Sequence, residues 1–255
     1  MGNLMCEEWA CKMEKSRRPA HNQSFFYRDS AMTEQARIFD EIVFQRRALR
    51  AFLPRPVPTD ILERVFTVAQ RAPSNCNTQP WLTHVASGAS LQSLAEELPR
   101  RFMTGQITLD FPYDGVYQGI YKERQYGSAQ ALYDAVHIER SDKARRHEQF
   151  MRNFTFFDAP HVAFLFLPEP FGLREAADLG MYAQTLMLAM TAHGLGSCPQ
   201  TALSFEADII RERLGVAAVN KLLFGISFGY ADPASPVNDC VTDRAALADC
   251  VSFHA

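Results

Sequence analysis

One uninterrupted apolar stretch decides the fold class: His161-Val162-Ala163-Phe164-Leu165-Phe166-Leu167. It holds no acidic residue, lysine or arginine and has the length of a strand, so it predicts a central β-strand that is buried on both faces. A similar stretch from Leu222 to Tyr230 predicts a second buried strand. A sheet that is buried on both faces needs helices on each side.

Helical and strand-like segments alternate on both sides of these strands. Helical spacing of apolar residues is found at residues 59–72, 173–193 and 204–214, a charged helical pattern at 128–153, and strand-like composition at 81–86 and 196–200. We expect Thr59 to cap the first helix and Gly194 to end the long one in a left-handed conformation. The alternation predicts a sandwich of three layers.

The bulk composition excludes several classes of function. The formal net charge is −3, so neither nucleic acid nor a membrane surface is an expected partner. The six cysteines show no paired spacing, and we expect reduced thiols in a cytoplasmic protein. Residues 1–32 are polar and lack periodicity, so we expect a flexible N-terminal arm before one domain at residues 33–255.

Apolar residues at 38, 39 and 42 predict a helix that begins near Thr33, and a dense positive cluster follows it. It consists of Arg46, Arg47 and Arg50. Guanidinium groups bind phosphate oxygens in bidentate fashion, and in an extended segment Arg46 and Arg50 would point the same way. The cluster indicates a phosphate site, with a solvated basic turn as the alternative.

Other chemistries have weaker signals. The loop from Pro73 to Trp81 offers amide and hydroxyl groups, which is typical of a binding loop or of an ordinary turn. The histidines form neither an HxxxH pair nor an HExxH motif, so no metal site is expected, and glycine motifs of Rossmann and P-loop proteins are missing. A nucleophilic Cys198 is a further hypothesis, although its apolar neighbourhood favours inert packing.

An aromatic-rich excursion is expected at about residues 99–127, between two predicted regular segments. Its aromatic rings could stack on a flat aromatic substrate or pack a dimer interface. The candidate substrate contacts are Phe102, Tyr113, Tyr121 and Tyr126.

Five motifs, in their order and spacing, resemble the nitroreductase family. They are Arg46-Arg47-Ala48-Leu49-Arg50-Ala51-Phe52, Pro56-Val57, Ala72-Pro73-Ser74-Asn75-Cys76-Asn77-Thr78-Gln79-Pro80-Trp81, Gly194-Leu195-Gly196-Ser197-Cys198-Pro199-Gln200 and Gly229-Tyr230-Ala231-Asp232. Within the family, Asn153-Phe154, Phe157-Asp158-Ala159-Pro160 and Asp178-Leu179-Gly180-Met181 are most similar to the nitrobenzoate-reductase type. The resemblance implies an α+β fold, a three-layer α/β/α sandwich with a central mixed sheet. It also implies a homodimer with FMN at the subunit interface.

The resemblance assigns roles to the cofactor-binding residues. Arg46, Arg47 and Arg50 would hold the phosphate and the pyrimidine end of FMN, and Arg244 would return to the phosphate from the C-terminal loop. Ala48 stands where the family often has serine. Two further groups would contact FMN: from the partner subunit Pro73, Ser74, Asn75 and Asn77, and along the flavin ring Pro199, Gln200, Thr201 and Asn153.

The function that the resemblance implies is electron transfer from NADPH or NADH to a nitroaromatic acceptor by a ping-pong mechanism. No catalytic side chain is required, because flavin N5 carries the chemistry. Alternatives on the same fold are a quinone or enoate reductase, a reductive dehalogenase and an oxygen-dependent flavin-fragmenting enzyme. A non-catalytic flavin carrier is an alternative of another class.

Overall fold

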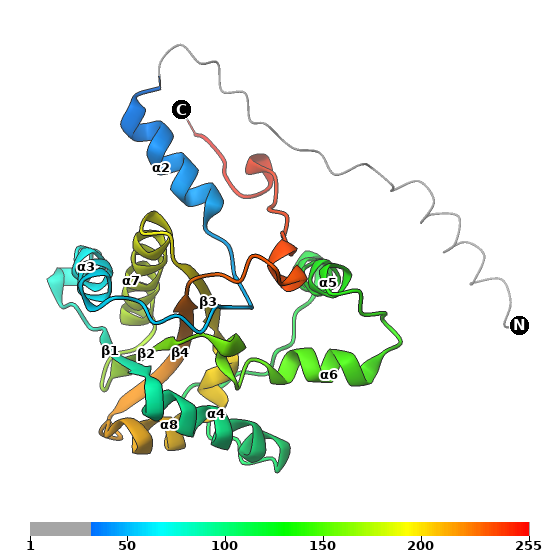
Figure 1. The fold of residues 1–255 in the computed structure, drawn as a ribbon. Helices are drawn as coiled ribbons and strands as arrows, with labels where there is room; N and C mark the ends of the chain where they lie inside the picture. Colours follow the sequence, from blue (N-terminus) through cyan, green and yellow to red (C-terminus); the bar gives the residue numbers. More distant parts are fainter. Residues whose placement is uncertain (1–31, 255) are drawn as a thin grey trace, which may run out of the picture. The chain divides into compact units, whose positions relative to one another are not determined.

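The computed structural model describes residues 32–254 (Figure 1). The chain divides into two compact units, Met1–Phe39 and Asp40–Ala255, and helix α2 (Glu34–Gln45) crosses the boundary. Of the first unit only residues 32–39 are described, and there the Ala36 N–H donates to Thr33 Oγ1 at 3.2 Å, which caps α2. The expected N-terminal arm falls on residues 1–31, outside the described part. Within residues 32–254, no helix is both long and apolar enough to cross a membrane.

A four-stranded sheet forms the centre of the second unit. Its strand order is β1 (Leu82–Ser87), β2 (His161–Pro168), β4 (Asn220–Gly229) and β3 (Gly196–Gln200). The two predicted buried strands, β2 and β4, therefore lie side by side in the middle of the sheet. All three strand pairings are antiparallel.

The expected mixed character of the sheet is wrong for these strands. Parallel pairing among residues 32–254 is confined to isolated bridges, Ala48 with Ser197 and Thr108 with Glu206. Burial on both faces, which the apolar pattern of β2 does reveal, is set by the covering helices and does not depend on strand direction.

Helices cover both faces of the sheet (Figure 1). Residues 163, 165 and 167 of β2 pack into one core with α3 (Thr59–Ala69) and α7 (Leu173–Ala192). Residues 162, 164 and 166 pack into a second core with α4 (Gly88–Met103) and α8 (Ala207–Leu214). Because neighbouring residues of a strand face opposite sides, one apolar run fills both cores. The α+β sandwich of three layers is confirmed.

The helices differ from the sequence prediction at several places. The charged helical pattern at 128–153 is covered by two helices, α5 (Gly119–Ala135) and α6 (Lys143–Met151). Thr59 is the first residue of α3, and Pro58 occupies the cap position with no side-chain hydrogen bond. α4 is not predicted from the sequence, and its C-terminal end, from Pro99 to Met103, occupies the start of the expected excursion. The predicted helix at 204–214 starts as a 3₁₀ turn, η3 (Thr201–Phe205), before α8. The long helix α7 is as predicted, and Gly194 has a φ of 72°.

The aromatic-rich excursion is shorter than expected. Its irregular part runs only from Thr104 to Gln118, and α5 (Gly119–Ala135) and α6 (Lys143–Met151) follow. The remaining elements are short 3₁₀ turns: η1 (Asn75–Asn77), η2 (Phe156–Asp158), η4 (Pro236–Asp239) and η5 (Leu247–Asp249).

Candidate functional site: an arginine pocket

A pocket of about 1120 Å³ lies between the segment after α2, the start of β3 and the C-terminal loop. We call it the arginine pocket. Six of the predicted FMN contacts line it: Arg46, Arg47, Ala48, Arg50, Pro199 and Arg244. The fold thus brings the early arginine cluster and the C-terminal arginine to one cavity.

Backbone hydrogen bonds fix the arginine segment against the sheet. The Leu49 N–H donates to the Ser197 carbonyl of β3 at 3.0 Å, and the Leu53 N–H donates to the Tyr230 carbonyl at 2.8 Å. A Cβ at Gly196 would lie 2.6 Å from Leu49 Cδ1, so any larger residue there would force the Leu49 side chain to move. These bonds hold the segment beside β3 like a short extra strand, and its side chains line the pocket.

Asn238 connects the arginine segment to the loop after β4, a role that sequence reasoning missed. Its Oδ1 accepts the Arg50 N–H at 2.8 Å, while its Nδ2 donates to the carbonyls of Ala51 (2.9 Å) and Asp232 (3.0 Å). The side chain is buried. An asparagine beside Pro236 looks like an ordinary turn residue in sequence, because burial and long-range partners leave no local pattern.

The arginine pocket has a strongly positive lining. In the described part of the chain, no carboxylate lies within ion-pair distance of Arg46, Arg47, Arg50 or Arg244. Burial, and after it the nearby charge of Arg244, lowers the pKa of the Arg46 guanidinium. Like charges brought together without a counter-charge are unfavourable, and a bound dianion relieves that repulsion. The residues present therefore suit a phosphate group.

Gln200 follows Pro199 on β3, but its amide is engaged inside the protein. Its Nε2 donates to the carbonyl oxygen (2.9 Å) and the Oδ1 (3.2 Å) of Asn153, and its Oε1 accepts the hydroxyl of the fully buried Ser227. The structure thus brings Gln200 and Asn153 together, while Thr201 is exposed at the start of η3. Ser227 is a further residue that sequence reasoning missed.

The loop with Pro73, Ser74, Asn75 and Asn77 does not line the arginine pocket of its own chain. It connects the end of α3 to β1, and it is exposed apart from the half-buried Ser74. Within one subunit, the predicted contacts therefore fall into three groups. Six line the arginine pocket, four lie on this loop, and Gln200, Thr201 and Asn153 belong to neither set.

The four predicted substrate contacts also lie outside the pocket lining. Phe102 packs in the second core, with its ring centroid 4.5 Å from that of Phe154, and Tyr113 lies 6.1 Å from the ring of Phe205. Tyr121 and Tyr126 are exposed on α5. Only the first two thus share one aromatic cluster, around Phe205.

Comparison with known proteins identifies the family. The family model described as the nitroreductase family matches residues 43–230. The chain belongs to the nitroreductase family. Nitroreductase NfnB of Mycolicibacterium smegmatis is 46% identical over 219 residues, which cover 86% of this chain and 93% of that protein. A 4-nitrobenzoate reductase of Pseudomonas putida is 33% identical over 202 residues, which cover 78% of this chain and 88% of that protein.

A solved member of the nitroreductase family has the same fold. The crystal structure of the FMN-dependent nitroreductase NfnB from Mycobacterium smegmatis in complex with NADPH superposes with a TM-score of 0.84 at 45% identity. The match covers 87% of this chain and 100% of that one.

The surroundings of Cys198 oppose a nucleophilic role. Cys198 packs with Phe52, Phe157 and Ala159, and its side chain is buried. Burial raises the pKa of the thiol to about 11, although the charges of Arg50 and Arg46 oppose the shift. The reactive thiolate is therefore scarce at neutral pH.

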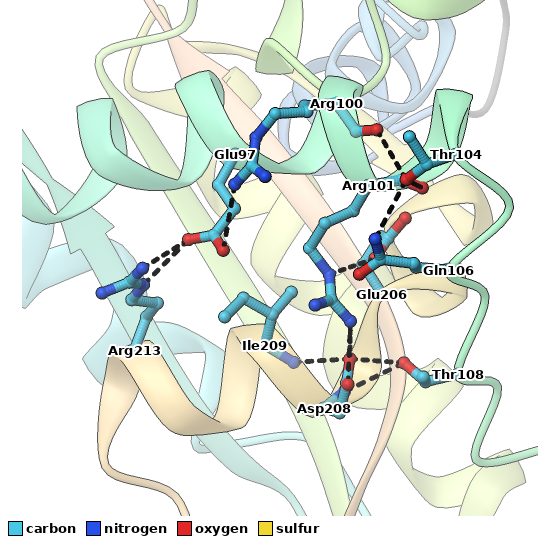
Figure 2. A network of polar contacts seen from close by, with 10 residues as sticks. All are labelled: Glu97, Arg100, Arg101, Thr104, Gln106, Thr108, Glu206, Asp208, Ile209 and Arg213. Atoms are coloured by element: carbon cyan, nitrogen blue, oxygen red, sulfur yellow. Dashed lines mark hydrogen bonds and ion pairs between the residues drawn. The ribbon is translucent and has the colours of Figure 1, made fainter.

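A polar network fixes the start of the excursion to α8 (Figure 2). Arg101 on α4 donates to Glu206 at 3.0 Å and to Asp208 at 2.8 Å, and the Thr108 hydroxyl donates to Asp208 at 2.5 Å. Glu206 is fully buried, and burial raises the pKa of its carboxyl while Arg101 opposes the shift. The Thr108 N–H also donates to the Phe205 carbonyl at 2.8 Å. The start of the excursion is therefore held to the segment before α8 and to α8 itself by the hydrogen bonds of Thr108.

Proposed function

We propose that this protein is an FMN-dependent oxidoreductase that passes electrons from NADPH or NADH to a nitroaromatic acceptor. One observation carries the proposal: Arg46, Arg47, Arg50 and Arg244 converge on one pocket, and within residues 32–254 none of them pairs with a carboxylate. FMN ends in a phosphate, for which guanidinium groups are well suited. Relatives with substantial identity are named as FMN-dependent, and one was crystallised with NADPH.

Each group of residues has a defined task in this proposal. The four arginines bind the phosphate and the pyrimidine end, and Pro199, Gln200 and Thr201 lie against the flavin ring, with Asn153 as a further contact. When bound, FMN would supply the redox chemistry that connects a nicotinamide donor to an acceptor. Nearby guanidinium groups would stabilise the negative charge that the flavin ring gains on reduction. No side chain of the protein has to act as a nucleophile.

A nitroaromatic acceptor and ping-pong kinetics belong to the same proposal. Relatives are named for nitrobenzoate and nitrobenzene reduction. Nicotinamide and acceptor would use one open face of the cofactor in turn, which gives ping-pong kinetics. Tyr113, Tyr121 and Tyr126 are exposed and available to stack on a flat ring, and Phe102 supports Tyr113 through their shared neighbour Phe205.

The proposed assembly is a homodimer with FMN at the subunit interface. The Ser74–Gln79 loop lies outside the arginine pocket of its own chain, which is expected if it serves the partner's site. α5 has no buried residue and exposes Ile120, an apolar side chain that a second subunit would cover. The four described cysteines are free, which supports the proposed cytoplasmic location.

An absorbance spectrum followed by anaerobic reduction tests the proposal. Purified protein supplied with FMN is expected to be yellow, to bleach on addition of NADPH or NADH, and to recover its colour on addition of a nitrobenzoate. Protein that binds FMN but never bleaches would instead be a flavin carrier. Protein that stays colourless after addition of FMN would refute the assignment.

A further inference from the structure

The loop Ser74–Gln79 has an unusual backbone for a segment with no glycine. Cys76, Asn77 and Gln79 have φ values of 51°, 56° and 48°, in the left-handed region. Side chains with a Cβ rarely adopt this region, so such a conformation persists only where surrounding contacts enforce it. The loop is nevertheless exposed apart from Ser74. Specific hydrogen bonds must therefore enforce its shape.

Asp178 of α7 supplies the long-range contact. Its Oδ2 accepts the Asn75 N–H at 3.0 Å, and its side chain is buried, with the residue 4% exposed. The remaining bonds are local: Ser74 Oγ accepts the Gln79 N–H at 2.9 Å, and the Asn75 carbonyl accepts the Thr78 N–H at 3.0 Å. Asp178 thus connects the first residue of η1 to the rigid long helix.

The same face of α7 also holds the far end of the loop. Tyr182 lies one helical turn after Asp178, and its ring stacks on Trp81 with centroids 4.9 Å apart. Trp81 Nε1 donates to Gln70 Oε1 at 2.9 Å. One helix face therefore fixes both ends of the loop, by a hydrogen bond at one end and by ring stacking at the other.

We propose that Asp178 is a positioning residue, which holds Ser74, Asn75 and Asn77 in the shape that contacts FMN in the partner subunit. This inference rests on the proposed function. A carboxylate is costly to bury, and a leucine would fill a similar volume without that cost. The hydrogen bond from the Asn75 N–H offsets part of that cost and connects the loop to α7.

Two substitutions separate the hydrogen bond from packing. Asp178→Asn keeps an acceptor oxygen, and it is expected to bind FMN within about threefold of the original protein. Asp178→Leu keeps the volume but leaves the Asn75 N–H without an acceptor, and it is expected to weaken FMN binding about tenfold. Glu175→Leu is the matched control, because Glu175 also lies on α7 and accepts a backbone N–H, that of Gly172 at 3.0 Å, but stands outside the loop and the pocket lining. No change in FMN affinity is expected for this variant. FMN affinity is measured by quenching of flavin fluorescence, with the unfolding temperature recorded for each variant. Equal affinities for Asp178→Asn and Asp178→Leu would overturn the proposal.

Mixed dimers keep the test decisive even if Asp178→Leu is less stable. One subunit carries Asp178→Leu and the other carries Arg244→Ala, with different affinity tags for purification. One of the two sites then combines an intact arginine pocket with an intact loop, so we expect one tightly bound FMN per mixed dimer. At the same FMN concentration, either parent homodimer is expected to bind far less. If the mixed dimer binds no more FMN than the parent homodimers, the proposal that the loop acts on the partner's site is wrong. FMN retention by Arg244→Ala would instead contradict the proposed function itself.

Discussion

Cys198 shows how burial can outweigh charge at a single residue. Two guanidinium groups nearby, those of Arg50 and Arg46, favour a thiolate, and a reactive cysteine in other proteins is often created in this way. Here the thiol packs against Phe52 and Phe157 on the inner side of β3, and removal from water dominates. The pKa is raised to about 11, so the thiol stays protonated across the physiological range.

Alkylation with iodoacetamide tests this account of Cys198. At pH 7.5 the exposed Cys250 is expected to react readily in the folded protein, whereas Cys198 reacts only after unfolding. Peptide mass spectrometry gives the extent of labelling at each position. Cys198→Ala is expected to retain turnover with NADPH and a nitroaromatic. Rapid labelling of Cys198 in the folded protein, or loss of turnover in the alanine variant, would restore the nucleophile hypothesis.

At the scale of elements, the network of Arg101, Glu206 and Asp208 joins α4 to α8 and anchors the excursion (Figure 2). Burial raises the pKa of Glu206, so the folded protein holds this proton more tightly than the unfolded chain does. The contribution of Glu206 to stability is therefore full below its ordinary pKa and is lost as the pH rises toward the raised value. Arg101 limits that loss by stabilising the ionised carboxylate.

Arg101→Ala is expected to destabilise the protein by about 3–5 kcal/mol at pH 7, since it leaves the buried Glu206 without its cation. Because the pKa of Glu206 then rises further, the deficit is expected to shrink between pH 7 and pH 5. Urea unfolding at both pH values measures the difference from the original protein. In Arg101→Ala/Glu206→Gln this pH dependence should disappear. An equal deficit at both pH values in the single variant would show that the ionised carboxylate is not the cause.

Periodicity predicted most elements but not all of their details. The apolar run 161–167 and the pattern from Leu173 to His193 are long enough that burial alone dictates a strand and a helix. Strand direction, in contrast, depends on how distant segments pair across the sheet. The same holds for Asn238 and Asp178, whose roles come from partners far away in the chain. The arginines that the family resemblance groups together do line one pocket, which is built from three separate segments of the chain, and their binding roles stay predictions.

At the scale of the whole molecule, the candidate site is built from several segments that lie far apart in the sequence. Three segments build the arginine pocket: the one after α2, the strand β3 and the C-terminal loop. The Ser74–Gln79 loop lies between α3 and β1, outside the lining of that pocket. Membership in the nitroreductase family and the excess of guanidinium charge both favour FMN as the group that completes it. The central claim is thus that these arginines bind the phosphate of a flavin.

Comparison of FMN with riboflavin, which has the same ring and ribityl chain but no phosphate, tests that claim most directly. Isothermal titration of the original protein is expected to give at least about 100-fold tighter binding of FMN, which corresponds to about 2.7 kcal/mol. In Arg244→Ala the affinity for FMN should fall about tenfold, while that for riboflavin stays within about twofold. Equal affinities for the two flavins in the original protein would contradict the account.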